Sequence, residues 1–287
     1  MSTSFGARLA EAFDARGQLC VGIDPHPFLL EDWGLQNTPA GLREFALKVV
    51  DAAAAQVAIV KPQVAFFERH GAAGYLVLEE VITSARAAGL LVIADVKRGD
   101  VGSTVEAYAQ AWLAPGSSLE VDAMTVSAYQ GVDSLGAPIA LAHAEGKGLF
   151  VLAATSNPES FELQRSIVQS GPTAGATVAA SIVEEVATIN ERDRLGQLGS
   201  IGLVLGATVN LDSYGIALER LCGAVATPVL APGFGHQGAS FEQLGTRFGP
   251  AAAHVVVSAS RSILSAGPGG IAAAVRSQAA EVARWRG

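Results

Sequence analysis

The sequence predicts an α/β protein that folds as a single (β/α)8 barrel of the TIM type. Eight short apolar runs punctuate its 287 residues, and stretches with helical spacing separate them. Strict alternation of strand and helix implies parallel strands joined by right-handed crossovers. Eight such units in fewer than 300 residues fit one closed barrel. We therefore expect one domain over residues 1–287, with no interdomain linker.

The expected strands are runs of continuous apolar sequence, as in parallel strands that are buried on both faces. They are Cys20–Asp24, Val57–Lys61, Leu91–Lys97, Ala123–Ser127, Leu149–Thr155, Ile201–Thr208, Pro228–Gly233 and His254–Ser260. An open, doubly wound sheet is the main alternative. No Gly-x-Gly-x-x-Gly follows the first run, which argues against the dinucleotide-binding form of that fold.

Helical spacing marks the segments between these strands. An N-terminal helix is expected within Met1–Gly17, others around 42–50 and 75–82, and a last one from about Gly270 to Arg286. Gly89 is a plausible stop for the second of the internal helices. The widest gap between strands, 156–200, is expected to hold a long loop as well as a helix, since Ser170-Gly171-Pro172 interrupts it.

Composition excludes several classes of protein. Half of the residues are hydrophobic and only 16% are charged, which argues against a disordered chain. A net charge of −8 argues against non-specific nucleic-acid binding, because that requires clustered cations. The two cysteines, Cys20 and Cys222, are too few for a disulfide framework and are expected to behave as small buried hydrophobes. Neither a membrane-spanning run nor the apolar core of a signal peptide is visible, so we expect a cytoplasmic protein.

Polar residues gather where the expected strands end, which is where barrels of this type carry their active sites. The residues at those ends are Asp24, Lys61, Asp95, Lys97, Asp100, Ser127, Thr155, Thr208, 233–238, Ser260 and Arg261. The strand interiors are almost wholly apolar. We therefore expect one polar site at the carboxyl end of the barrel.

The strongest signal is the sequence Asp95-Val96-Lys97-Arg98-Gly99-Asp100. Residues two apart on a strand share a face, so Asp95 and Lys97 should both face the barrel mouth, with Val96 packing outward. Together with Lys61 they would form an array of alternating ammonium and carboxylate groups. A purely structural ion-pair network is the alternative, although desolvating such charges costs several kcal/mol.

The last two strand ends predict a phosphate site. Glycines in the segment 233–238 allow backbone amides to approach an anion, and Gln237 offers an amide donor. Arg261, which follows Ser260, can clamp a phosphate through two hydrogen bonds. A flexible turn beside a surface arginine is the alternative, but loops after strands seven and eight of such barrels often bind phosphate.

Other candidates carry weaker signals. Asp24 could bind a sugar hydroxyl or cap a turn, and a metal site with His26 lacks further ligands at suitable spacing. Ser127 could bind the edge of a heterocycle or the backbone. Thr104 could be an ordinary residue of a helix N-terminus, and Phe66 and Phe67 are expected in the core.

Asp95-x-Lys97-x-x-Asp100, preceded by Lys61, resembles the orotidine 5′-phosphate decarboxylase family, specifically its longer bacterial subgroup of the actinobacterial type. The similarity extends over essentially the whole chain and includes the segments 21–27, 60–68 and 153–158. The chain departs from shorter members in the segment 156–200 and in having Ser260, where glycine is common. Both differences fall on loops that would contact a ligand.

The resemblance implies a homodimer that converts orotidine 5′-monophosphate (OMP) to UMP and CO2 in pyrimidine biosynthesis, without metal or cofactor. It assigns Lys97 as the acid that protonates C6 and places Asp95 beside the substrate carboxylate, held by Lys61. Asp100 and Thr104 would reach the neighbouring subunit's site. The remaining implied contacts are Asp24 and Lys61 to the ribose, Ser127 to the pyrimidine, and Gln237, Arg261 and backbone amides of the adjoining loops to the phosphate. Gly235 and Ser260 lie on those loops and are further candidates for substrate binding.

Two other functions remain open from the sequence. Sugar-phosphate lyases of the same barrel group bind magnesium and place a glutamate at the end of strand two, where this chain has Lys61. A lysine there would repel a metal ion. A non-catalytic nucleotide-binding barrel is the second alternative, which would bind UMP-like ligands without turnover.

Overall fold

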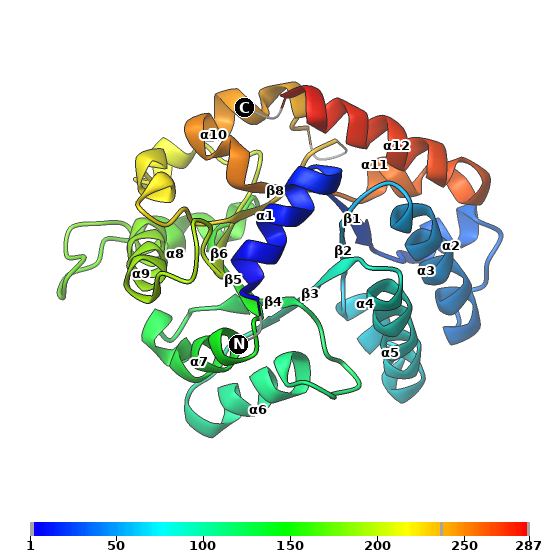
Figure 1. Cartoon of the computed structure of the whole chain (residues 1–287), viewed down its shortest axis with the longest axis horizontal. Coiled ribbons are helices and arrows are strands. Elements are labelled where there is room, and N and C mark those ends of the chain that lie inside the picture. The colour runs from blue at the N-terminus through cyan, green and yellow to red at the C-terminus, as the bar shows by residue number, and fades with distance from the viewer. Residues whose placement is uncertain (1–2, 236–237, 286–287) are drawn as a thin grey trace.

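The computed structural model describes residues 3–235 and 238–285, and its strands form a closed barrel (Figure 1). Every neighbouring pair of strands is parallel, and the first pairs with the last. The strands are β1 Leu19–Ile23, β2 Ile59–Pro62, β3 Leu91–Arg98, β4 Ala123–Ser127, β5 Gly148–Ala154, β6 Ile201–Leu205, β7 Val229–Pro232 and β8 Val255–Ala259. The predicted (β/α)8 barrel is therefore confirmed.

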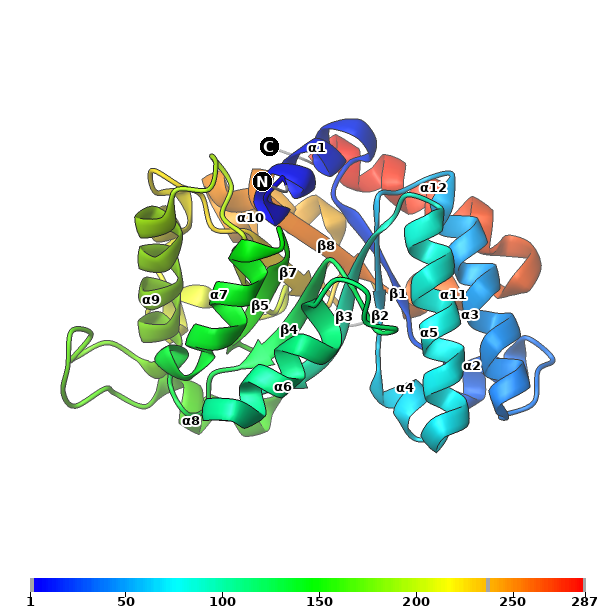
Figure 2. The same cartoon turned by 60° about the horizontal axis from the view of Figure 1, so that its bottom comes forward.

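Helices surround the barrel (Figure 2). The α-helices are α1 Phe5–Arg16, α2 Pro27–Asp32, α3 Pro39–Ala54, α4 Ala65–Glu68, α5 Gly71–Ala87, α6 Gly102–Leu113, α7 Gly136–Ala144, α8 Phe161–Arg165, α9 Val178–Asp193, α10 Leu244–Phe248, α11 Arg261–Leu264 and α12 Gly267–Trp285. Within the described residues, none of these helices is long and apolar enough to cross a membrane.

The strict alternation expected from the sequence fails after β6. Only two short 3-10 helices, Leu211–Tyr214 and Leu218–Cys222, lie between β6 and β7. The expected strand to Thr208 stops at Leu205, because the chain turns where the amide of Val209 donates to the carbonyl of Gly206. The wide gap at 156–200 holds α8, a loop closed by an Ile167–Thr177 bridge, and α9.

Helix α1 closes the amino end of the barrel (Figure 1). Its apolar residues Phe5, Leu9 and Phe13 join a buried cluster with strand residues that include Ile59 and Phe150. The rings of Phe5 and Phe150 meet edge to face at 6.0 Å. A Cβ on Gly148 would lie 2.3 Å from the Phe5 ring, so only glycine permits this close approach. The amino end is thereby sealed, and the open end is the carboxyl end.

Free thiols occupy two different settings. Cys20 is fully buried inside the barrel, and burial raises the pKa of its thiol to about 12. Cys222 is half-buried and packs against the core, and no disulfide joins the two. The prediction that both cysteines are small buried hydrophobes is therefore confirmed for Cys20, whereas Cys222 is only half-buried.

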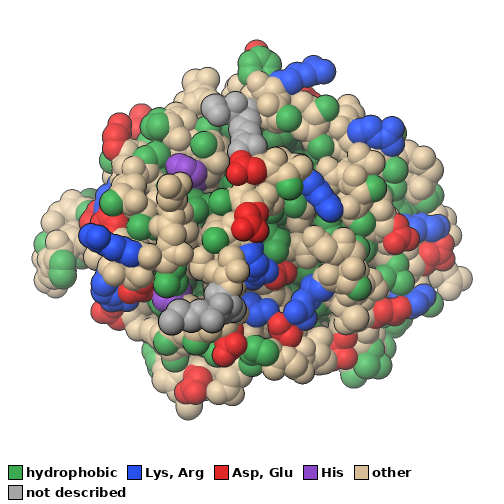
Figure 3. Space-filling view, in the orientation of Figure 1, with side chains coloured by type: hydrophobic (Ala, Val, Ile, Leu, Met, Phe, Trp, Pro, Cys, Tyr) green, Lys and Arg blue, Asp and Glu red, His purple; other side chains and the backbone are tan. Residues whose placement is uncertain are grey.

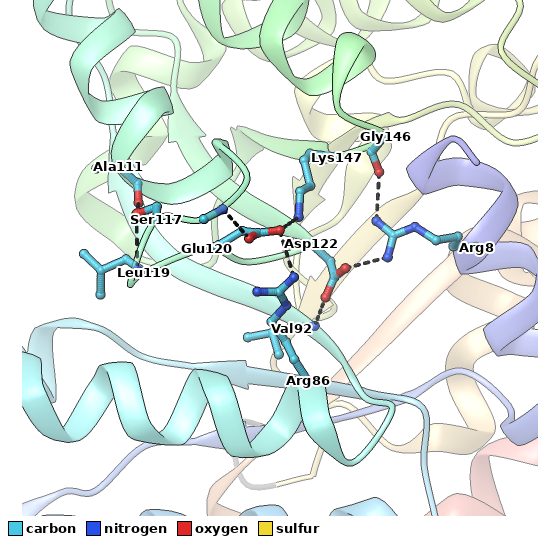
Figure 4. A network of polar contacts seen from close by, with 11 residues as sticks. Arg8, Arg86, Val92, Ala111, Ser117, Leu119, Glu120, Asp122, Gly146 and Lys147 are labelled. Atoms are coloured by element: carbon cyan, nitrogen blue, oxygen red, sulfur yellow. Dashed lines mark hydrogen bonds and ion pairs between the residues drawn. The ribbon is translucent and has the colours of Figure 1, made fainter. Parts of the chain in front are cut away.

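A polar network fastens α1 to the base of the barrel (Figure 4). Arg8 forms an ion pair with Asp122 and donates to the Gly146 carbonyl at 2.8 Å, while Asp122 also accepts from the Val92 amide at 2.9 Å. Beside it, Glu120 accepts from Lys147 at 2.6 Å and from Arg86 at 2.8 Å. The face over which α1 lies carries interspersed acidic and basic side chains (Figure 3).

The ionised carboxylate of Glu120 is expected to stabilise the folded protein. Burial opposes its ionisation, but hydrogen bonds from Lys147 and the Gly116 amide lower its pKa to about 2. We expect Glu120→Gln to lower the free energy of unfolding at pH 7 by about 2 kcal/mol, since Lys147 stays buried without its anion. Urea unfolding measures this loss.

The pH dependence checks the cause. Because the folded pKa lies below the unfolded value of about 4.3, the stabilisation is complete above that value and disappears as the pH falls towards 2. The difference in free energy of unfolding between the wild type and Glu120→Gln should therefore shrink over that range. Glu11→Gln, on the exposed face of α1, is the matched control and should leave stability unchanged at every pH. A difference in free energy of unfolding that does not change with pH would contradict stabilisation by the ionised Glu120 carboxylate.

Candidate active site

A cavity of about 610 Å³ opens at the carboxyl end of the barrel. Side chains from all eight strands, or from the loops that follow them, line it. They are Asp24, His26, Lys61, Gln63, Phe66, Asp95, Lys97, Thr125, Leu152, Thr155, Ser156, Asn157, Ser160, Gln164, Val204, Leu230, Pro232, Gly233, Phe234, Ser258, Ser260 and Arg261. Polar side chains come mainly from the ends of β1 to β4 and β8 and from the loop after β5, whereas β5, β6 and β7 themselves contribute apolar side chains.

Asp95 sits between two ammonium groups at the cavity wall. Its Oδ2 atom lies 2.9 Å from Lys61 Nζ, and its Oδ1 atom lies 2.5 Å from Lys97 Nζ. The Lys61 side chain is only 6% exposed, whereas that of Lys97 is 48% exposed. One lysine is therefore a fixed structural partner of the carboxylate, and the other extends into the accessible cavity.

The mutual charges keep this cluster ionised. Burial by itself would raise the pKa of Asp95, but Lys61 and Lys97 together hold that pKa well below its usual range. Burial likewise opposes the charged form of Lys61, yet Asp95 and Asp24 raise its pKa above the ordinary value. The cavity wall thus presents the Asp95 anion beside the Lys61 cation over the whole physiological pH range.

The backbone at Lys97 is locally strained. Its φ of 49° lies in the left-handed region, which side chains rarely occupy. The register between β3 and β4 shifts here, since Ala94 pairs with Met124 and Arg98 with Val126. Two extra residues therefore bulge from β3, and strain of about 1–3 kcal/mol in such positions is typical of functional sites.

Two buried oxygen atoms at the β1–β8 edge have no hydrogen-bond partner within the described residues. They are Asp24 Oδ1 and Ser260 Oγ, and both side chains line the cavity. A Cβ on Gly22 would lie 2.7 Å from Ser260 Cβ, so glycine is needed for the strands to hold both groups this close. Unpaired buried polar atoms are costly, so this edge is suited to a ligand that carries hydroxyl groups.

The residues expected at the phosphate end differ in their position relative to the cavity. Gly233 (φ 112°), Ser260 and Arg261 line the cavity. Gly235 is not among the lining residues, because its amide donates within its own loop to the Ala239 carbonyl at 2.8 Å. Gln237 lies outside the described residues.

Three further sequence candidates lie away from the cavity of their own chain. The Asp100 carboxylate accepts from the Val101 amide at 2.8 Å, and Thr104 is exposed in the first turns of α6. Ser127 packs beside Gly99, where a Cβ would lie 2.4 Å from the Ser127 carbonyl oxygen. The structure therefore does not bring these residues together with Asp95 and Lys97 within a single subunit.

Sequence reasoning missed several cavity residues. Thr125 and Gln63 lie two positions from Ser127 and Lys61, and the two-residue period of a strand could have indicated both. Ser156, Ser160 and Gln164 come from the loop after β5, which has no such regular period. Gln164 bonds both the amide and the hydroxyl of Thr155 at 2.9 Å and so fixes this loop.

The two phenylalanines that were expected in the core lie in different surroundings. Phe67 is buried in the core as expected, but Phe66 lines the cavity and packs 4.2 Å from the His26 ring. No group of three or more His, Cys, Asp or Glu side chains suited to a metal ion occurs in residues 3–235 and 238–285. Asp24 and His26 both line the cavity, but the described residues provide no third ligand of that kind.

Fold and site together define an enzyme of the (β/α)8-barrel class whose charged cluster lies at the carboxyl ends of the strands. The model of the orotidine 5′-phosphate decarboxylase / HUMPS family matches residues 17–276. The chain therefore belongs to that family.

Similar proteins support this placement. The chain is 51% identical to the orotidine 5′-phosphate decarboxylase of Salinispora tropica over 265 residues, which are 92% of this chain and 91% of the relative. The relative from Corynebacterium efficiens is 47% identical over 98% of each chain. A Streptomyces avermitilis crystal structure, provisionally described as an orotidine 5′-phosphate decarboxylase, is 45% identical, with a TM-score of 0.91 over 99% of this chain and 96% of that one.

The unequal burial of the two lysines predicts unequal effects on stability. Both contact Asp95, yet we expect Lys61→Met to lower the free energy of unfolding by about 3 kcal/mol and Lys97→Met by less than about 1 kcal/mol. Since the pKa of Asp95 is lowered and that of Lys61 is raised, the Lys61 contribution should be complete between about pH 4 and pH 10. Urea unfolding of both variants measures the difference, and equal losses would contradict this assignment.

Proposed function

We propose that the protein decarboxylates OMP to UMP and CO2 without a metal ion or organic cofactor. The observation that carries the proposal is Asp95 held between Lys61 and Lys97 in the cavity wall. The family membership and the relatives' name support the substrate. Lys61 occupies the strand-two position at which a metal-binding lyase needs an acidic ligand, so nothing in the site favours the magnesium-dependent alternative.

Electrostatics supplies the driving force in this proposal. A substrate carboxylate about 4 Å from Asp95 experiences roughly 4 kcal/mol of repulsion at an effective dielectric constant near 20. This repulsion decreases as neutral CO2 departs. The Lys97 ammonium attracts the electron pair left on C6 more strongly than it attracts the substrate. Both effects stabilise the transition state relative to the bound substrate.

Lys97 is the proposed proton donor. The C6–carboxyl bond breaks, its electron pair stays on C6, and a proton from Lys97 Nζ forms the new C–H bond. Lys97 suits this role because it is half-exposed to the cavity, whereas Lys61 is buried behind Asp95. After release of CO2, the neutral amine takes a proton from solvent, which restores the ammonium.

The rest of the cavity accounts for the other parts of the substrate. Asp24 and Ser260, with their unpaired oxygen atoms, are placed to bind ribose hydroxyls, with Lys61 beside Asp24. Arg261 and the backbone near Gly233 are the proposed phosphate ligands. Ser156 lines the cavity and Ser127 does not, so we assign the serine that binds the pyrimidine to the loop after β5.

We further propose a homodimer with shared sites. Asp100 and Thr104 lie outside the cavity of their own chain. Val101, which follows Asp100, and Tyr129, which follows β4, expose 53% and 77% of their surface. Large exposed apolar side chains beside an unused carboxylate are consistent with a protein interface. In the dimer, Asp100 and Thr104 would reach the partner's ligand.

The reaction is tested by the absorbance change on adding purified protein to OMP in the presence of EDTA. We expect rapid loss of OMP absorbance and formation of UMP at the same rate with and without EDTA. Activity that EDTA abolishes and magnesium restores would contradict metal independence. UMP binding without turnover would contradict catalysis.

Subunit complementation tests the shared site. Lys97→Ala and Asp100→Ala should each lose nearly all activity, because one removes the proton donor and the other the partner's carboxylate. Mixed and re-associated in equal amounts, they should regain about a quarter of wild-type activity, since half of the dimers are mixed and each contains one intact site. No recovery in a preparation shown to contain mixed dimers would place Asp100 in its own subunit's site.

A further inference from the structure

Thr125 forms a hydrogen-bond hub beneath the charged cluster. It lies in the middle of β4, is 1% exposed, and lines the floor of the cavity. Its Oγ1 atom is 3.0 Å from the Val96 amide, 2.9 Å from the Lys97 amide and 3.0 Å from Asp95 Oδ1. Three consecutive residues of β3 thus converge on one hydroxyl group.

The chemistry of a hydroxyl fixes the direction of each bond. A threonine hydroxyl has one proton to donate and two lone pairs that accept. The amides of Val96 and Lys97 can only donate, so they occupy both lone pairs. The proton must then point at Asp95, which as a carboxylate can only accept. Thr125 is therefore saturated, with a single orientation available to it.

These bonds replace missing sheet contacts. The bulge between Ala94 and Arg98 removes the Val96 and Lys97 amides from the regular β3–β4 ladder. Buried amides without partners are costly, and Lys97 also has its positive φ. The Thr125 hydroxyl satisfies both amides and so stabilises the bulge that directs the Lys97 side chain back to Asp95.

We infer that Thr125 is a positioning residue that holds both members of the Asp95–Lys97 pair in their working geometry. This inference rests on the proposed decarboxylation. The hydroxyl orients the Asp95 carboxylate directly and Lys97 through its backbone. Its function lies in the reaction rather than in substrate affinity, because the proposed ribose and phosphate ligands lie at the carboxyl ends of β1, β2, β7 and β8, and Thr125 bonds none of them.

Three variants test this inference. Thr125→Val preserves the shape but removes the hydroxyl, Thr125→Ser keeps the hydroxyl, and Thr125→Ala provides a smaller side chain in case valine prevents folding. Thr227→Val is the matched control. Thr227 is also fully buried, its hydroxyl accepts from Asn190 at 3.3 Å, and neither residue lines the cavity.

We expect Thr125→Val and Thr125→Ala to lower kcat for OMP at least tenfold, with KM and calorimetric UMP affinity within about threefold of wild type. Thr125→Ser should recover kcat to within about threefold, and Thr227→Val should leave kcat unchanged. A kcat within twofold of wild type for the valine or alanine variant would overturn the inference. A kcat for Thr125→Ser as low as that of Thr125→Ala would also overturn it, because the hydroxyl group would then not be what supports the reaction.

Amide hydrogen exchange gives a second readout that does not require turnover. Exchange in the segment 92–101 should accelerate in the valine and alanine variants but not in the serine variant, while the rest of the barrel stays protected. Unchanged exchange in this segment would also overturn the inference. If wild-type protein fails to turn over OMP, the proposed function fails, and the exchange experiment still decides whether Thr125 holds the bulge.

Discussion

The charged cluster at the cavity wall depends on a carboxylate that is held ionised where little solvent reaches it. Asp95 remains ionised because Lys61 and Lys97 contact its two oxygen atoms separately. Removing charges from water is expensive, so such an arrangement persists only when the surrounding structure fixes the geometry. Much of the carboxyl half of the barrel interior serves this purpose. The Thr125 hydroxyl, the bulge in β3 and the buried Lys61 all constrain the same carboxylate.

The two ends of the barrel differ in how completely their polar groups are satisfied. At the amino end, α1 and the apolar layer around Phe150 form a closed core, and the Arg8–Asp122 and Glu120–Lys147 pairs fasten that base (Figure 4). At the carboxyl end, the structure contains strain at Lys97 and unpaired oxygen atoms on Asp24 and Ser260. A well-packed base allows the opposite end to remain incompletely satisfied until a ligand binds.

The difference between the two lysines follows from their place in the strands rather than from their residue type. Lys61 lies within β2, where neighbouring strands exclude solvent, and its ammonium has Asp95 and Asp24 near it. Lys97 lies near the end of β3, within the bulge between Ala94 and Arg98, and about half of its side chain is exposed. The same ammonium group is therefore a fixed counter-charge at Lys61 and, in our proposal, a proton donor at Lys97.

The sequence by itself determined the barrel and the central charged cluster. Continuous apolar runs locate all eight strands, and the two-residue period places Asp95 and Lys97 on one face. The sequence did not determine that the β6–β7 connection lacks an α-helix, because short 3-10 helices leave no repeating pattern of apolar residues. Only the tertiary structure showed that Ser156 rather than Ser127 lines the cavity and that Thr125 lies beneath the charged cluster. These outcomes depend on where irregular loops return to the barrel, and on a bulge whose extra residues are stabilised by a side chain from the neighbouring strand.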